Sequence, residues 1–236
     1  MAKRQFKAES KRLLDLMVNS IYTHKEIFLR EIISNASDAC DKLCYQALTD
    51  DAVGMSRKDF KIEIKVDKEH RTLTVSDNGI GMDKEDLENN LGVIASSGSY
   101  KFKQEVGDDA KDTDVIGQFG VGFYSAFMVA DHITVVTRKY GTDAAWMWQS
   151  SGADGYTITE CERDAVGTDI IMHIKPDTDD EKYSEFLESW RLQELVRKYS
   201  DYIRFPIRME VSKTRRKEGS PDDKPEYETY QEEETL

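Results

Sequence analysis

The sequence contains little cysteine and no long apolar run. Its three cysteines are Cys40, Cys44 and Cys161, and their spacing matches neither a CxxC redox motif nor a zinc knuckle. An odd number without a pairing pattern favours free, buried thiols in a reducing compartment. No apolar stretch approaches the roughly 20 residues of a transmembrane helix, and none follows the basic N-terminus as in a signal peptide. We therefore expect a cytoplasmic protein with no membrane partner.

Basic charge is also scarce. Lys and Arg total 33 against 46 Asp and Glu, which gives a formal net charge of −13. Such a surface repels nucleic-acid backbones, so we expect no nucleic-acid partner, although backbone N–H groups can still bind a small anion locally. What the chain does contain is 39% hydrophobic and 10% aromatic residues. That content is enough for the core of one large domain.

Periodicity predicts an α+β domain in which helices cover one face of a mixed sheet. Helical spacing predicts an amphipathic helix over 10–21 and a second helix that ends near Leu48, with a capping box formed by Thr23 and Glu26. Strict alternation over 59–79 predicts a hairpin. The remaining predicted elements are a helix from Asp83 to about Leu91, a short helix at 123–130, strands near 132–138, 144–149, 156–161 and 168–175, a helix at about 180–200, and a strand at 203–211.

Two segments lack sustained periodicity. Residues 95–116 are rich in Gly, Ser and Asp, and we expect a long mobile segment, which in a compact domain is more often functional than idle. Residues 212–236 are highly charged and predict the start of a solvated linker after a domain over 1–211. Such a linker indicates one piece of a longer protein.

The stretch REIISNASDACDK, residues 30–42, has two distinct faces. On a helical wheel Asn35 and Asp38 lie within about 40° of Glu31, and the apolar stripe lies more than about 90° away. Periodicity alone favours an ordinary solvated helix face. The alternative is the floor of a binding site.

The stretch TLTVSDNGIGM places an acid among buried positions. Asp77 is in phase with Leu73 and Val75, and a buried carboxylate without a specific partner is costly. Gly79 and Gly81 then permit a sharp turn and a close approach by a flat ligand. A plain Asp-Asn-Gly turn is the equally weighted alternative.

Two further motifs point in the same direction. In GQFGVGFYS, Gly117, Gly120 and Gly122 expose backbone N–H groups at a helix N-terminus, which favours phosphate binding, although a flexible hinge has the same composition. The spacing matches neither GxGxxG after a strand nor the P-loop. In VGTDIIMHI, Thr168 has an inward hydroxyl that needs a partner, and a backbone carbonyl would serve.

One ligand explains these separate signals together. A purine nucleotide would present a flat ring to Asp77, phosphates to the glycine-rich loop, and a metal or water to Glu31 and Asn35. We therefore predict a purine-nucleotide site.

These motifs also resemble a known family. The segments EIFLREIISNASDACDK, DNGIGM, NNLGVIASSGS, GQFGVGFYSAFMV and GTDIIMHI, in this order, resemble the N-terminal domain of the HSP90 chaperone family over about residues 5–210. The wider superfamily includes histidine kinases, type II topoisomerases and mismatch-repair ATPases. The resemblance implies a two-layer sandwich that binds ATP or ADP with Mg²⁺ between helices and sheet. It also implies a stress-response chaperone that is homodimeric in full length and acts on unfolded or partly folded clients.

The resemblance implies a role for each matching residue. Asp77 would accept a hydrogen bond from the adenine amino group, assisted through water by Gly81 and Thr168. Asn35 would help to hold Mg²⁺, and Glu31 would be the general base. Residues 92–122 would form a lid. The other implied nucleotide-binding residues are Asp38, Met82, Asn90, Gly117, Gly120, Val121, Gly122 and Phe123.

Two features set limits on this expectation. The family usually has Lys or Arg where this chain has Ser96, and no arginine stands out in the pocket motifs for stabilising the transferred phosphate. By resemblance that arginine comes from a middle domain, so we expect slow hydrolysis by the isolated domain. The alternatives are a histidine kinase catalytic domain, which needs a phosphoacceptor histidine, a topoisomerase or repair ATPase, which the acidic balance disfavours, and a nucleotide sensor that does not hydrolyse.

Overall fold

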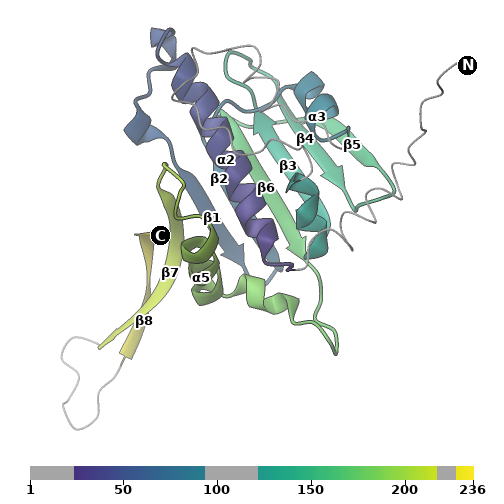
Figure 1. Ribbon diagram of the computed structural model, residues 1–236, viewed down its shortest axis with the longest axis vertical. Coiled ribbons are helices and arrows are strands. Elements are labelled where there is room, and N and C mark those ends of the chain that lie inside the picture. The colour runs from purple at the N-terminus through teal and green to yellow at the C-terminus, as the bar shows by residue number, and fades with distance from the viewer. Residues whose placement is uncertain (1–23, 94–121, 217–226) are drawn as a thin grey trace, which may run out of the picture.

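The computed structural model describes residues 24–93, 122–216 and 227–236. One layer is an eight-stranded sheet with the strand order β5-β4-β3-β6-β2-β1-β7-β8 (Figure 1). Among the described strands β1 and β7 pair in parallel, and every other neighbouring pair is antiparallel. The strands are β1 Ile62–Asp67, β2 Thr72–Asp77, β3 Ala130–Arg138, β4 Ala145–Ser150, β5 Tyr156–Cys161, β6 Gly167–Ile174, β7 Ile207–Arg216 and β8 Tyr227–Thr235.

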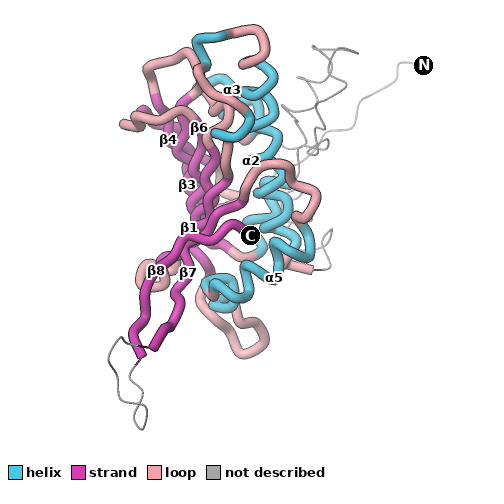
Figure 2. The backbone as a smooth tube through the Cα atoms, turned by 90° about the vertical axis from the view of Figure 1, so that its left-hand side faces the viewer, coloured by secondary structure: helices cyan, strands magenta, loops and turns pink. Residues whose placement is uncertain are grey.

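The helices form the second layer. Figure 2 shows α2, α3 and α5 on the same side of the sheet, whereas none of the described helices covers the opposite face, which we call the open face. This arrangement confirms the predicted mixed, mostly antiparallel α+β sandwich with helices on one face. The described helices are α2 Ile27–Gln46, α3 Lys84–Asn90 and α5 Ser189–Tyr199, with 3₁₀ turns η2 Asp51–Val53, η3 Arg57–Asp59, η5 Gly122–Met128 and η6 Tyr183–Leu187.

Helix α2 is central to the core because its apolar stripe faces the sheet. Leu29, Ile32 and Ile33 of this stripe are at most 1% exposed, and they belong to the same cluster as Leu73 and Val75 of β2. Burying such side chains contributes about 1.5–3 kcal/mol each. The alternation predicted for β2 and the stripe predicted for α2 are therefore both confirmed, and they fix which sides of the two elements meet.

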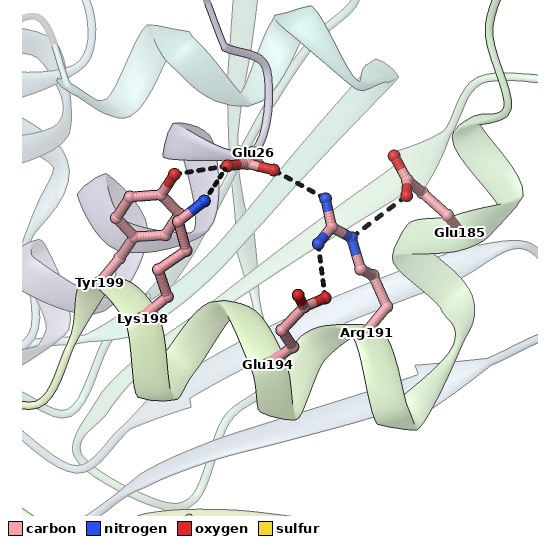
Figure 3. A network of polar contacts seen from close by, with 6 residues as sticks. All are labelled: Glu26, Glu185, Arg191, Glu194, Lys198 and Tyr199. Atoms are coloured by element: carbon pink, nitrogen blue, oxygen red, sulfur yellow. Dashed lines mark hydrogen bonds and ion pairs between the residues drawn. The ribbon is translucent and has the colours of Figure 1, made fainter.

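A polar network fixes the start of α2 against α5 (Figure 3). The Glu26 carboxylate accepts hydrogen bonds from Arg191 Nη2 at 2.7 Å, from Lys198 Nζ at 3.0 Å and from the Tyr199 hydroxyl. The Tyr199 hydrogen bond and the two cations lower the pKa of Glu26 to about 2. The Glu26 side chain makes no capping bond to α2, and the predicted capping box of Thr23 and Glu26 stays a prediction. Thr23 and the predicted helix over 10–21 lie outside the described residues.

Two predictions near the C-terminus are wrong in part. The single helix predicted at 180–200 is divided into η6 and α5, because Glu188 has extended backbone angles, φ −96° and ψ 122°. The linker predicted from residue 212 contains regular structure, since β7 continues to Arg216 and pairs with β8 over nine residue pairs. The strand is held by cross-strand ion pairs, Lys213 with Glu232 at 3.0 Å and Arg215 with Glu228 at 2.7 Å. The amino-acid composition reveals that this segment is highly charged, but it does not reveal which charges pair across the two strands.

The cysteines agree with the prediction in their oxidation state. All three are free, and Cys40 is buried, whereas Cys44 and Cys161 are partly exposed. The expectation that all three thiols are buried is therefore confirmed for Cys40 and wrong for the other two.

Candidate functional site

The end of β2 carries a buried carboxylate in a tight turn. Asp77 is 7% exposed, and its Oδ1 accepts a hydrogen bond from the Gly79 N–H at 2.9 Å. Burial raises the pKa of Asp77 to about 7. The turn lies directly on α2: a Cβ on Gly79 would stand 2.3 Å from the carbonyl carbon of Ala39, and the Ile80 N–H donates to the Ala39 carbonyl at 3.0 Å. Glycine at position 79 is therefore required by the close approach of the α2 backbone, whereas the sequence predicted the approach of a flat ligand.

A hydroxyl pair lies beside Asp77. In the β2–β6 register Asp77 is opposite Thr168, which is 4% exposed. Thr168 Oγ1 lies 3.0 Å from Thr137 Oγ1, and Thr137 Oγ1 accepts a hydrogen bond from the Met82 N–H at 2.9 Å. Gly81 has a φ of +67°, which glycine adopts without strain. The inward hydroxyl of Thr168 therefore has a second threonine as partner, and this pair joins β3, β6 and the loop before α3.

Sequence reasoning missed Lys42, a half-buried lysine on α2. Burial lowers its pKa, while the charges of Asp38, Asp86 and Asp77 act in the opposite direction. Asp38 is 1% exposed and lies one turn earlier on the same helix. The i, i+4 spacing of Asp38 and Lys42 was the available signal, because it places a cation on the helix face that carries the acids. The polar face of α2 and the end of β2 thus share one electrostatic environment.

A second carboxylate lies nearer the start of α2. The Glu31 side chain is 24% exposed, and burial raises its pKa, although Arg30, with its Nε 3.9 Å from Glu31 Oε1, acts in the opposite direction. A Cβ on Gly122 would stand 2.3 Å from Glu31 Oε2, so η5 begins against this carboxylate. Asn35, half-buried, follows one turn later on α2. A carboxylate with a raised pKa is suited to accept a proton.

The first turn of η5 is held by aromatic packing. Phe123 is 6% exposed and makes an edge contact with Trp148 at a centroid distance of 5.4 Å. The Tyr124 hydroxyl donates to the Leu91 carbonyl at 2.9 Å, directly after α3, whose last residue is the half-buried Asn90. The ring of Phe123 therefore packs in the core, while η5 and the end of α3 are held side by side.

Helix α2 connects two clusters of predicted site residues. Glu31 and Asp38 are about 10 Å apart along the helix axis, a separation that a nucleoside triphosphate spans. The solvated face favoured by periodicity alone is wrong for Asp38, which is buried. The first cluster contains Asp77, Gly81, Met82 and Thr168, the second contains Glu31 and Gly122, and Asn35 and Asp38 lie between them. The predicted residues Gly117, Gly120 and Val121, together with Ser96 and all of the lid 92–122 except its ends, lie outside the described residues.

Comparison with protein families gives the class of this domain. The family described as "Histidine kinase-, DNA gyrase B-, and HSP90-like ATPase" matches residues 22–168, which include both clusters. The chain belongs to this ATPase family. Membership in this family implies that this HSP90-like ATPase domain binds a nucleotide. A second family, described as "Hsp90 protein", matches residues 185–235.

Curated relatives of this ATPase domain support the HSP90 branch of the family. The chain is 58% identical over 237 residues to "Chaperone protein HtpG" of Clostridium botulinum (strain Langeland / NCTC 10281 / Type F). It is 58% identical over the same length to the proteins of that name from Clostridium perfringens (strain 13 / Type A) and Bacillus subtilis (strain 168). All of this chain is covered, and it spans 37% of each of these relatives. The predicted resemblance to the HSP90 chaperones is therefore confirmed.

In the part of the chain that the structure describes, no helix of this ATPase domain combines the length and the apolar character needed to cross a bilayer.

Proposed function

We propose that this chain is the ATP-binding and slowly hydrolysing domain of an HSP90-type chaperone. Binding of ATP would close residues 92–122 over the nucleotide and so drive the remodelling of unfolded or partly folded client proteins. The observation that carries this proposal is the position of α2, which brings the Asp77 cluster and the Glu31–Gly122 contact to one helix. Because the chain spans 37% of its relatives, chaperone activity, homodimer formation, a cytoplasmic location and a stress-response role of the whole protein are part of the proposal.

The adenine ring would bind at the end of β2. The ionised carboxylate of Asp77 accepts hydrogen bonds only, so it matches the exocyclic amino group of adenine. The backbone at Gly81 packs against the end of β3, because a Cβ there would stand 2.0 Å from the Arg138 carbonyl oxygen. The Thr168 hydroxyl lies in the neighbouring strand, where it can bind a bridging water. A keto oxygen at the same ring position would meet the carboxylate as acceptor against acceptor. The proposal therefore favours adenine over guanine.

The phosphates would extend along α2 toward Gly122. Asn35 would contribute an amide oxygen to Mg²⁺, which usually binds through one or two protein ligands together with substrate phosphates, and which neutralises phosphate charge when it is bound. This donor set fits a metal that arrives with the nucleotide: among the described residues no group of three or more His, Cys, Asp or Glu side chains is arranged to hold a metal ion.

Glu31 would act as the general base on the attacking water. A positioned carboxylate contributes about 10²–10⁴ in rate, and the burial that raises the pKa of Glu31 increases its basicity. None of the predicted pocket residues is an arginine, although phosphoryl transfer usually requires one. Hydrolysis by this domain alone is therefore expected to be slow, with the arginine supplied by another part of the longer protein.

The experiment that tests the proposed function is the substitution Glu31→Ala in the full-length protein. ATP affinity should stay within about twofold of the wild type, while turnover should fall at least about 100-fold. The matched control is Glu63→Ala, because Glu63 is a partly exposed carboxylate on β1 whose charge pairs with Lys61 at 3.2 Å. Unchanged turnover in Glu31→Ala would remove Glu31 from the role of base, and a wild type that binds ATP without turnover would indicate a sensor.

A further inference from the structure

The open face of the sheet carries two histidines that are direct cross-strand partners. His132 of β3 is opposite His173 of β6. Their chain neighbours Ile133 and Met172 are fully buried on the helix-covered face, so by strand alternation both imidazoles are on the open face that Figure 2 shows. Both histidines are partly exposed. This pair lies on the face of the sheet opposite to the proposed nucleotide site.

A β-bulge brings a carboxylate to one of the two rings. The β3–β6 register passes from Ala130–Ile174 to His132–His173, so Asp131 is an extra residue in β3. Bulges redirect side chains in this way. Asp131 Oδ1 lies 2.6 Å from His173 Nδ1. A carboxylate can only accept a hydrogen bond, so the proton of a neutral His173 is on Nδ1, and its Nε2 has a free lone pair.

The second ring is oriented through the same nitrogen. His132 Nδ1 lies 3.0 Å from the hydroxyl oxygen of Ser151. When Nδ1 donates to this hydroxyl, the Nε2 of His132 also keeps its lone pair. Metal-binding histidines in proteins show the same arrangement, in which the other ring nitrogen donates to a carboxylate, a carbonyl or water and so fixes the ring.

We propose that His132 and His173 bind one divalent transition-metal ion, with Zn²⁺ as the representative, through their two Nε2 atoms. Directly opposed residues in a sheet have Cβ atoms about 4.5–5.5 Å apart, within reach of one ion at Zn–N distances of about 2.0–2.1 Å. Imidazole is a preferred ligand of zinc, copper and nickel. No third protein ligand completes the site among the described residues, so water fills the remaining positions, and the bound ion joins β3 to β6.

Zinc titration of the nucleotide-free chain, followed by calorimetry, tests the proposal. The wild type should bind one Zn²⁺ at this site, and His132→Gln or His173→Gln should each weaken binding at least tenfold. The double variant should bind more weakly than either single one, but by less than the product of the two single effects, because both rings bind the same ion. Asp131→Asn should weaken binding about 10–100-fold, since it removes the partner that orients His173.

The chain provides a matched control for a single histidine. His70 Nδ1 lies 2.7 Å from Asp67 Oδ2 on the turn between β1 and β2, which repeats the carboxylate–imidazole pair without a cross-strand histidine. The zinc affinity of His70→Gln should stay within twofold of the wild-type affinity. Equal weakening by His70→Gln, unchanged affinity in both variants of the cross-strand pair, or loss of zinc binding in Cys161→Ser instead would overturn the proposal. Because the titration contains no nucleotide, these outcomes test the metal site alone and do not test the proposed ATP site.

Discussion

Replacing the buried carboxylate of β2 by an amide should stabilise the domain while it removes nucleotide binding. The pKa of Asp77 is raised from 3.8 to about 7. At high pH the folded protein therefore buries an ionised carboxylate in a site that favours the neutral acid. Three pKa units correspond to about 4 kcal/mol. Below pH 3.8 the carboxyl is neutral in both states and costs nothing. As pH rises, the unfolded chain ionises first and the wild type loses stability, until the loss is complete above the folded pKa.

The substitution Asp77→Asn removes this titration and keeps the shape of the side chain. Urea unfolding should give a stability advantage for Asp77→Asn that grows from about 1.5 kcal/mol at pH 5 to about 4 kcal/mol at pH 8. The same variant should show no measurable ATP binding by calorimetry, because it loses a buried charge-assisted hydrogen bond worth about 1.5–3 kcal/mol. A stability difference that is independent of pH, or one that falls as pH rises, would refute the burial argument. Near-native ATP affinity would refute the adenine assignment.

Three further changes test the supports of the site. Glu26→Gln should lower the free energy of unfolding at pH 7 by about 3 kcal/mol, because the pKa of Glu26 is about 2 instead of 4.5; this contribution, measured by urea unfolding, should disappear as pH falls from 4.5 toward 2. Thr137→Val removes the hydroxyl next to Thr168, so calorimetry should show roughly tenfold weaker ATP binding by a folded domain, and unchanged affinity would exclude this positioning role. Gly79→Ala places a Cβ 2.3 Å from the Ala39 backbone and should cost about 1–3 kcal/mol in thermal unfolding, whereas a neutral effect would contradict the close approach.

Local sequence patterns were sufficient to predict most strands of the sheet. The alternation of Leu73 and Val75 placed Asp77 on the inner face of a strand, and the strand confirms it. The helix capped by Asp83 was also predictable, because the Asp83 side chain accepts a hydrogen bond from the Asp86 N–H three residues later. Such features depend on residues that are close in sequence, and their physical cause can therefore be read from the chain directly.

The environment of the polar face of α2 was not predictable from periodicity. Spacing gives the angle between Glu31 and the apolar stripe, but it cannot tell what covers the other face. The cover comes from Gly79 in the turn after β2 and from Gly122 at the start of η5, which are far from α2 in sequence. The resemblance to a family supplied this long-range information. No comparable signal was available for the pairing of β7 with β8, whose ion pairs join segments with many charges and few apolar residues.

The central claim is that one nucleotide binds both the end of β2 and the start of η5. Titration of Mg-ATP into glycine-labelled protein, followed by NMR, tests it directly, because the amide of Gly79 donates to Asp77 and Gly122 lies against Glu31. Both amide signals should shift with the same dissociation constant, and adenosine should shift the Gly79 signal alone. Signals that follow different binding curves, or a Gly122 signal that does not respond to Mg-ATP, would contradict the account.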